Sequence, residues 1–327
     1  MIYPKWLNYK DKIGVCALSA GVGKYLDAYL KSIKNLEKEF SIVETDSVRN
    51  NSYIANTGVA RALEFNSLVK DDSIDMIMCA TGGDFAIETL PYIDYDAVRN
   101  NPKLIMGASD PTSILYIITT KYDIATIYGL NACSYDQDNL HKSLTNNLEI
   151  LKGNLIVQDS FPLYEKEKSS KGSEYNLTEK DYWECLNGDV DIKGRIIGGC
   201  VDVLSDIIGT KYDETRSFVE RYSTDGFIWY FDVFSLSSEE FYRKLFQMQE
   251  AGWFYNVKGI LVGRVMYPSN SFDDFDYKDA LNKIFGPIPI IYNCDIGHVA
   301  PKMTIINGSI ASVKCSDGKG QISFELE

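Results

Sequence analysis

The chain has 327 residues and a formal net charge of −13, with 45% hydrophobic and 24% charged residues. This length predicts two domains or one large one, and the composition is that of an ordinary globular protein. A surface this acidic repels phosphate backbones and anionic lipids, so we expect no nucleic-acid partner and no membrane partner. The seven cysteines form no C-x-x-C pair, which favours reduced, mostly buried thiols. The first residues lack the apolar core of a signal peptide, so we expect a cytoplasmic protein.

Strand and helix signals alternate in the first part of the chain. Apolar runs at residues 12–18, 75–80 and 103–106 predict buried strands, and apolar side chains at helical spacing predict a helix over residues 26–40. This rhythm is typical of an α/β fold with a doubly wound, mostly parallel sheet. Ligands bind such sheets beyond the carboxyl ends of the strands. We therefore expect an N-terminal domain over residues 1–163.

Residues 164–193 are rich in charged and small side chains and have no apolar period. We interpret them as a linker or an exposed loop between domains. Beyond them we expect a second, β-rich α/β domain over residues 194–327. Its predicted elements are strands at 195–197, 227–231, 259–263 and 288–292, helices at 200–208 and 238–251, and a hairpin of strands at 309–313 and 321–326.

Ser109 follows the apolar run Leu104–Gly107 and precedes Asp110 and Pro111. This order predicts a strand, a sharp turn and a helix, with Asp110 as the N-cap and Pro111 in the first helical position. A serine presented at the carboxyl end of a strand, beside a helix N-terminus, is a candidate nucleophile. The alternative is an ordinary turn in which the serine satisfies backbone donors.

The chain has two histidines, His141 and His298, and a serine nucleophile needs one of them as its general base. His141 lies in a polar, helical stretch and is interpreted as a solvated helix residue. His298 follows a glycine in a loop after a predicted strand, and function concentrates in loops of this kind. His298 is therefore the candidate base, with a structural role as the alternative.

Asp232 ends the apolar run 227–231 and is the candidate third group, which would orient the histidine. A carboxylate at the end of a buried strand needs a partner, although it can also cap a turn. Gly82 and Gly83 follow a predicted strand and permit close backbone approach. The N–H groups of Gly83 and Asp110 are therefore candidate donors for an oxyanion, and a simple tight turn is the alternative.

Other patterns are weaker. The segment Gly21 to Lys24 lacks both the first glycine and the Ser/Thr of a phosphate loop, and there is no G-x-G-x-x-G motif. The acidic residues Asp273, Asp274 and Asp276 could bind a cation but are interpreted as a solvated loop. We therefore expect no cofactor and no metal.

Four short motifs, taken in order, resemble the LD-carboxypeptidase/microcin C self-immunity family of serine peptidases. They are Thr81-Gly82-Gly83, Gly107-Ala108-Ser109-Asp110, the GRIIGGC stretch at residues 194–200, and Gly297-His298-Val299-Ala300-Pro301-Lys302. The resemblance extends over nearly the whole chain. It implies a Ser-Glu-His triad, a two-domain fold and a homodimer. In this sequence the position of the family's glutamate, at the end of the run 227–231, is held by Asp232.

The resemblance also implies two substrate classes, both small molecules. One is a murein tetrapeptide, cut at an L-to-D amide bond, and the other is a microcin C-type aminoacyl or peptidyl nucleotide. Trp183, in the loop before residue 194, is a candidate for stacking on a nucleotide base, with packing at the domain interface as the alternative. Gly82 is a candidate for substrate contact. The alternatives to a peptidase are a catalytically weakened or inactive binding protein of the same fold and a general esterase.

Overall fold

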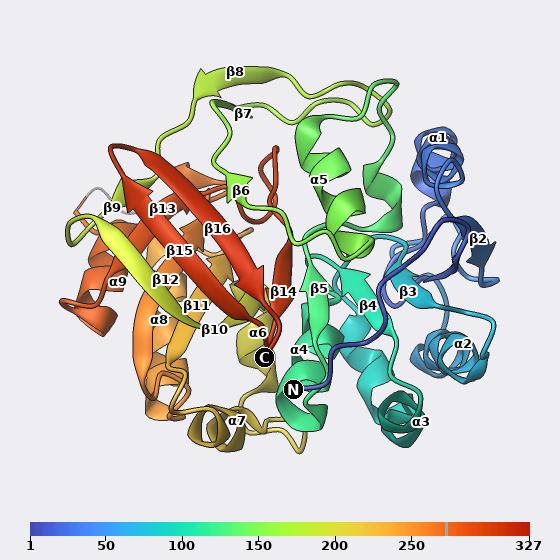
Figure 1. Cartoon of the computed structure of the whole chain (residues 1–327), viewed down its shortest axis with the longest axis horizontal. Coiled ribbons are helices and arrows are strands. Elements are labelled where there is room, and N and C mark those ends of the chain that lie inside the picture. Colours follow the sequence, from blue (N-terminus) through green and yellow to red (C-terminus); the bar gives the residue numbers. More distant parts are fainter. Residues whose placement is uncertain (272–273) are drawn as a thin grey trace.

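The computed structural model describes residues 1–271 and 274–327. Two β-sheets lie side by side, one built mainly from the first half of the chain and the other mainly from the second half (Figure 1). A two-stranded ribbon of β7 (Leu163–Glu165) and β8 (Leu177–Lys180) lies over both. The expected combination of a doubly wound, mostly parallel sheet and a second β-rich α/β region is confirmed.

The first sheet has the strand order β14-β5-β4-β3-β1-β2. Adjacent strands in it are parallel, except for the antiparallel pair β14–β5. Its strands are β1 (Lys12–Cys16), β2 (Ser41–Glu44), β3 (Met76–Cys79), β4 (Leu104–Gly107), β5 (Thr126–Tyr128) and β14 (Ile305–Asn307). The edge strand β14 comes from the far end of the chain. The two halves are therefore tied together by backbone hydrogen bonds as well as by packing.

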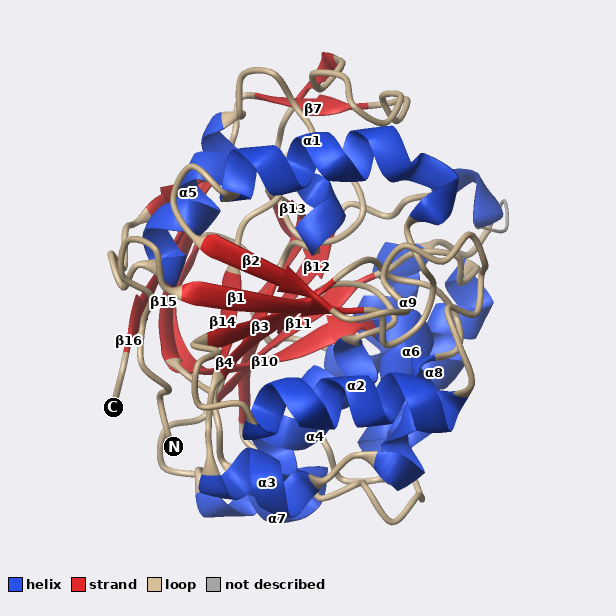
Figure 2. Cartoon of the chain, turned by 90° about the vertical axis from the view of Figure 1, so that its right-hand side faces the viewer, coloured by secondary structure: helices blue, strands red, loops and turns tan. Residues whose placement is uncertain are grey.

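Helices cover both faces of this sheet (Figure 2). On one face lie α1 (Leu26–Leu36) and α5 (Lys142–Leu151), and on the other lie α2 (Gly58–Lys70), α3 (Tyr95–Asn100) and α4 (Thr112–Tyr122). Successive residues of a strand point to opposite faces, so the continuous apolar runs fill two separate cores. In the described part of the chain, no helix has the length and apolar character needed to cross a membrane.

The second sheet has the order β6-β16-β15-β10-β11-β12-β13-β9, with β10 to β13 parallel. Its strands are β6 (Gln158–Asp159), β9 (Glu184–Cys185), β10 (Val190–Cys200), β11 (Phe227–Asp232), β12 (Val257–Gly263), β13 (Ile290–Cys294), β15 (Ile310–Ser316) and β16 (Lys319–Glu325). Its helices are α6 (Val201–Leu204), α7 (Thr215–Arg221), α8 (Ser238–Glu250) and α9 (Tyr277–Phe285).

Two expected segments differ in detail. Residues 164–193 contain most of the β7–β8 ribbon, all of β9 and the start of β10 instead of an irregular linker. The acidic stretch expected to be a solvated loop includes Asp276, whose carboxylate caps α9 by accepting from the N–H groups of Lys278 and Asp279. Asp273 lies outside the described residues.

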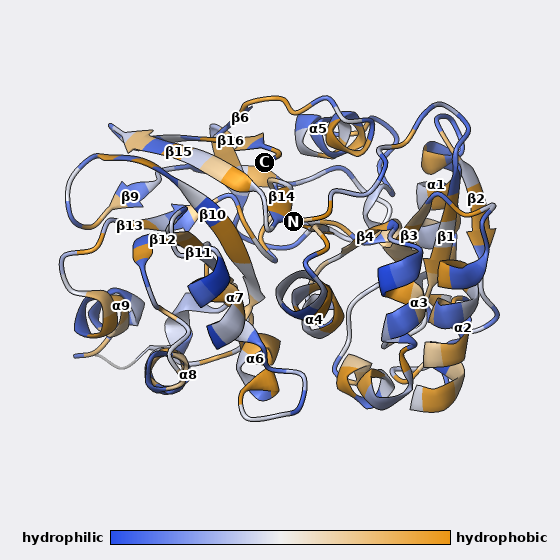
Figure 3. Cartoon of the chain, turned by 60° about the horizontal axis from the view of Figure 1, so that its bottom comes forward, coloured by the Kyte–Doolittle hydropathy of each residue, from blue (hydrophilic) through white to orange (hydrophobic). Residues whose placement is uncertain are grey.

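Helix α4 lies between the two sheets, as Figure 3 shows. Every residue from Thr112 to Thr120 is buried, which is expected of a helix that is covered on all sides. The Tyr116 ring stacks on Trp253 of the second half with a centroid distance of 5.3 Å. The backbone N–H of Cys200 donates to the Thr112 hydroxyl over 3.1 Å. The helix that follows Ser109 is therefore fixed to the second sheet.

Trp183 belongs to the core, and its predicted stacking on a substrate base is wrong. Its side chain is fully buried, and its indole N–H donates to the Asp295 carboxylate over 3.0 Å. The ring lies so close to the backbone of Gly320 that a Cβ there would approach ring atom Cε3 to 1.8 Å. These partners all belong to the second half of the chain, so the ring packs in the core of that half; packing at the domain interface stays untested.

We predict that Trp183→Ala lowers the free energy of unfolding by about 3–5 kcal/mol, because it leaves a cavity and removes one of the two N–H donors to the Asp295 Oδ2. Chemical denaturation measures the change. Tyr182→Ala, at the exposed neighbouring residue, is the matched control and is expected to cost less than about 1 kcal/mol. Equal stability of Trp183→Ala and the parent chain would contradict the burial of the ring.

Candidate functional site

Ser109 occupies a sharp turn directly beyond β4. Its φ of +69° lies in the left-handed region, which a residue with a Cβ rarely adopts. The side-chain amide of Asn131 holds the turn: it accepts from the Ala108 N–H at 3.0 Å and donates to the Ala108 carbonyl at 3.2 Å. This brace keeps Ser109 in a strained conformation at the carboxyl end of the strand.

Asp110 does not cap α4, contrary to the sequence prediction. The helix begins at Thr112 with Pro111 as its N-cap, and the Asp110 carboxylate accepts from the N–H of Ala86 at 2.7 Å. Burial raises the pKa of this carboxyl group. Asp110 therefore attaches the segment after β3 to the turn that carries Ser109.

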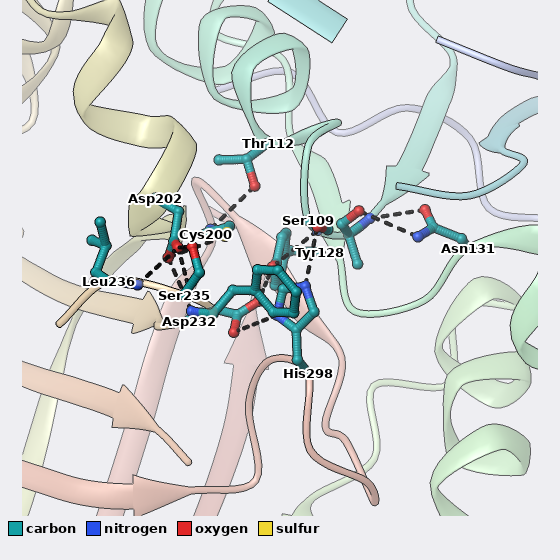
Figure 4. Close-up of polar contacts among 12 residues, drawn as sticks. Ser109, Thr112, Tyr128, Asn131, Cys200, Asp202, Asp232, Ser235, Leu236 and His298 are labelled. Atoms are coloured by element: carbon teal, nitrogen blue, oxygen red, sulfur yellow. Dashed lines mark hydrogen bonds and ion pairs between the residues drawn. The ribbon is translucent and has the colours of Figure 1, made fainter. Parts of the chain in front are cut away.

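His298 lies between Ser109 and Asp232, as drawn in Figure 4. Its Nε2 is 3.0 Å from the Ser109 Oγ, and its Nδ1 is 2.9 Å from the Asp232 carboxylate. An ionised carboxylate can only accept, so Nδ1 carries the proton and Nε2 accepts from the serine hydroxyl. The three side chains singled out from the sequence are thus brought into one chain of hydrogen bonds, which can move a proton away from Ser109.

Gly297 makes room for Asp232 beside the histidine. Its φ is +103°, and a Cβ at this position would lie 2.2 Å from the Asp232 Oδ1. Any larger residue would clash with the carboxylate and strain the backbone. The glycine before the histidine therefore sets how closely the loop approaches the end of β11.

Tyr128, at the end of β5, links the acid to the nucleophile and was not found by sequence reasoning. Its hydroxyl donates to the Asp232 Oδ2 over 2.5 Å and accepts from the backbone N–H of Ser109 over 3.2 Å. A tyrosine that ends a buried strand is indistinguishable from a core residue in the sequence. Only the pairing of β5 with β4 places it beside Ser109.

Asp232 is ionised in spite of its burial. Burial alone would raise its pKa, but His298, the Tyr128 hydroxyl and, at longer range, Lys302 stabilise the charged form and lower the pKa below its ordinary value. The carboxylate is therefore available to hold a positively charged imidazole.

The loop after Asp232 packs on the histidine. The ring of Phe234 lies 4.4 Å from that of His298 between centroids. The Asp202 carboxylate accepts from the backbone N–H groups of Phe234 at 2.9 Å and Ser235 at 2.7 Å, and so fixes the loop (Figure 4). The imidazole is held on one face by an aromatic ring and at its edge by the acid.

Gly82 and Gly83 pass directly beside Ser109. A Cβ on Gly82 would lie 2.9 Å from the Ser109 Cβ, and one on Gly83, whose φ is +148°, would lie 2.3 Å from the Ser19 Oγ. Within the described residues, the N–H groups of Gly83 and Asp110 have no hydrogen-bond acceptor. Both are therefore free to donate to another molecule.

Two cavities meet at His298. The larger, of about 340 Å³, is lined by Tyr164, Tyr292, Met266, Val299 and neighbouring residues, and it is bounded by the β7–β8 ribbon. The smaller, of about 90 Å³, is lined by lysines and serines. A ligand can therefore extend in two directions from the histidine.

The donor set at the site fits acid–base chemistry better than metal binding. Among the described residues, Cys200, Asp232 and His298 are the one group of potential ligand atoms close enough to share an ion. Burial raises the pKa of the Cys200 thiol well above its ordinary range, so it carries its proton in this structure. The histidine and the carboxylate already bond to each other.

The second histidine, His141, has a local role. It is the N-cap of α5, where its Nδ1 accepts from the N–H of Ser143 at 3.1 Å. Its ring is half-buried between Phe161 and Tyr175, so its expected solvation is wrong.

The LD-carboxypeptidase N-terminal domain pattern matches residues 13–129, and the C-terminal domain pattern matches residues 193–313. The chain belongs to the LD-carboxypeptidase family. The matches cover both halves, in the order that the sequence motifs suggested. They support a peptidase-type hydrolase.

Relatives within this family extend over most of the chain. A Vibrio cholerae protein provisionally named a carboxypeptidase is 25% identical over 93% of this chain and 92% of its own length. The microcin C7 self-immunity protein MccF of Escherichia coli is 32% identical, over 49% of each chain.

Solved structures of family members share the fold. The structure of MccF with aspartyl sulfamoyl adenosine superposes with a TM-score of 0.83 at 22% identity and covers 100% of both chains. The MccF-like protein of Streptococcus pneumoniae, solved with AMP, is 26% identical with a TM-score of 0.80, and the match covers 97% of this chain and 99% of that one.

We predict that Tyr128→Phe slows covalent labelling of Ser109 by a fluorophosphonate about 10- to 100-fold. The change removes a hydrogen bond to a charged group, which is worth about 1.5–3 kcal/mol. The second-order labelling rate, measured by mass spectrometry, tests this. Tyr116→Phe is the matched control, because it loses a buried hydroxyl bonded to Thr215 instead of the acid and is expected to label at the parent rate. Equal rates in both variants would show that the Tyr128 hydroxyl has no part in positioning the site.

Proposed function

We propose that the protein is a serine peptidase in which Ser109, His298 and Asp232 act as nucleophile, general base and orienting acid. The observation that carries this proposal is the continuous hydrogen-bond chain from the buried carboxylate through the imidazole to the strained serine. This is the arrangement that activates a hydroxyl which is otherwise a weak nucleophile.

The reaction would proceed in two halves. Ser109 Oγ attacks the scissile carbonyl carbon while its proton passes to His298 Nε2, and the resulting oxyanion accepts from the free N–H groups of Gly83 and Asp110. The C–N bond then breaks, and His298 returns the proton to the leaving amine. Water, deprotonated by the same histidine, hydrolyses the acyl-enzyme and restores Ser109. Gly82, which lies against Ser109, would let the substrate approach closely.

The aspartate in place of the family's glutamate is compatible with this role. Asp232 lacks one methylene, yet its carboxylate is 2.9 Å from the imidazole because the Gly297 backbone approaches it closely. This favours an active enzyme over the alternative of an inactive binding protein.

We infer two candidate substrate classes. The structures of MccF with aspartyl sulfamoyl adenosine and of the related Streptococcus pneumoniae protein with AMP favour an aminoacyl or peptidyl nucleotide. A murein tetrapeptide is the second candidate, because the chain belongs to the LD-carboxypeptidase family. The larger cavity, which is lined by aromatic, apolar and charged residues, has room for either a base or a peptide. A homodimer, implied by the family, stays a prediction.

We predict that a fluorophosphonate labels the parent chain at Ser109 and does not label Ser109→Ala. Intact-mass analysis measures the adduct, and peptide mapping locates it. Ser217→Ala, at an exposed serine of α7, is the control and is expected to label normally. An unlabelled parent chain that also fails to cleave either substrate would overturn the proposal.

We predict that Asp232→Asn lowers kcat by about 10⁴-fold with an intact fold, because the amide would donate to Nδ1 and favour the wrong tautomer of His298. Incubation with a murein tetrapeptide and, separately, an aminoacyl sulfamoyl adenosine, followed by mass spectrometry, measures turnover. Asp191→Asn removes an exposed carboxylate elsewhere and is expected to keep the parent rate. A loss of less than tenfold would assign the orienting role to another residue.

A further inference from the structure

Three lysines surround the smaller cavity at His298. Lys168 and Lys171 come from the loop between β7 and β8, and Lys302 lies four residues beyond His298. Lys168 also lines the larger cavity. A concentration of positive charge at this point contrasts with the net charge of −13 of the whole chain. Because charge of one sign in a cleft attracts ligands of the other sign, the cluster points to a ligand.

The ammonium groups of these three lysines form no ion pair within the described residues. Within residues 1–271 and 274–327, none of the three lies within 4.0 Å of a carboxylate oxygen. Two acidic residues also line the cavity, but their carboxylates accept backbone N–H groups of the loop. Glu165 accepts from Asn176 and Asp136 accepts from Gly172, each over 2.8 Å.

The charged form of Lys302 is disfavoured without a ligand, whereas Cys133 and Asp136 raise the pKa of Lys171. Burial, together with the charges of Lys168 and Lys171, lowers the pKa of Lys302 to about 8, although Asp232 acts in the opposite direction. An anion placed between the lysines would relieve this repulsion. Lys168 and Lys171 are exposed on the loop, so their long side chains can close on such a group.

The arginine at the site is not available to bind an anion. Arg264, which lines the larger cavity, is buried and already pairs through Nη2 with Asp181 at 2.6 Å and with Asp295. Its charge is balanced by two carboxylates and serves to fix the loop that leads to His298. Among the described residues, the smaller cavity has three lysines without an ion pair, whereas the larger has Lys166 and the shared Lys168.

We propose that Lys168, Lys171 and Lys302 bind the anionic group of the substrate, a carboxylate or a phosphate-type oxyanion that lies next to the scissile bond. This inference rests on the proposed function, because it places the anion on the molecule that Ser109 attacks. A free C-terminal carboxylate is separated from the scissile carbonyl by one residue, about 3.8 Å along the chain. The cavity adjoins the site of attack, because His298, which lines it, is 3.0 Å from Ser109.

Binding to the Ser109→Ala variant tests the inference without any need for turnover. Isothermal titration calorimetry compares AMP with adenosine, and N-acetyl-D-alanine with N-acetyl-D-alanine amide. We expect the anionic member of at least one pair to bind at least tenfold more tightly. In Lys302→Met, and separately in the exposed double variant Lys168→Met/Lys171→Met, that preference is expected to fall below threefold. Lys319→Met, at an exposed lysine of β16, is the matched control and is expected to keep it.

The two arms identify the source of the anion. A preference confined to AMP assigns the cavity to a phosphate-type group, and one confined to N-acetyl-D-alanine assigns it to a carboxylate. Equal binding within both pairs, or a preference that survives both sets of lysine changes, would overturn the inference. Fluorophosphonate labelling of the parent chain reports the nucleophile independently, so failure of the anion site is distinguishable from failure of the proposed function.

Discussion

The Asp232 carboxylate is buried at the junction of the two sheets, and its charge has to be balanced there. An unpaired buried charge costs several kcal/mol, and removal of one partner of a buried pair typically costs about 3–5 kcal/mol. The balancing donors come from different parts of the chain: Tyr128 from the first sheet and His298 from the loop after β13. Because both donors bond to one buried charge, these hydrogen bonds favour the observed relative position of the two halves, in which Ser109 lies beside the histidine.

The rest of the fold maintains this alignment. Helix α4 starts just after the turn that carries Ser109 and is buried between the sheets, and its first residue bonds to the end of β10. Strand β14 returns from the second half to pair with β5, whose last residue is Tyr128. The strand ends that carry Ser109 and Asp232 therefore meet at the junction. In most open parallel sheets the ligand crevice lies at a switch point within one sheet, whereas here it forms between two.

The shorter acid illustrates how backbone and side chain substitute for each other. The Asp232 carboxylate lies against the backbone of the histidine loop, and the absence of a Cβ at Gly297 permits that approach. The same loop is held from behind by Asp295, which accepts from Trp183 and pairs with Arg264. A fully buried tryptophan thus supports the site from the core. The sequence suggested that this large aromatic side chain stacks on a ligand, but in the structure it packs in the core.

The sequence by itself determined the parallel strands and the residues at their ends. Apolar runs predicted most of the buried strands, although the run 114–118 belongs to the buried helix α4. Ser109, Asp232 and His298 stand out because each directly follows or ends a predicted strand, or is one of two histidines. It could not reveal Tyr128, which is 104 residues from Asp232, or the lysines that gather around a cavity beside His298. Nor could it show that Trp183 is buried or that β14 crosses to the other sheet. Local patterns report which side chains must leave water, but contacts between distant segments depend on how two sheets pack, and only the tertiary structure decides that.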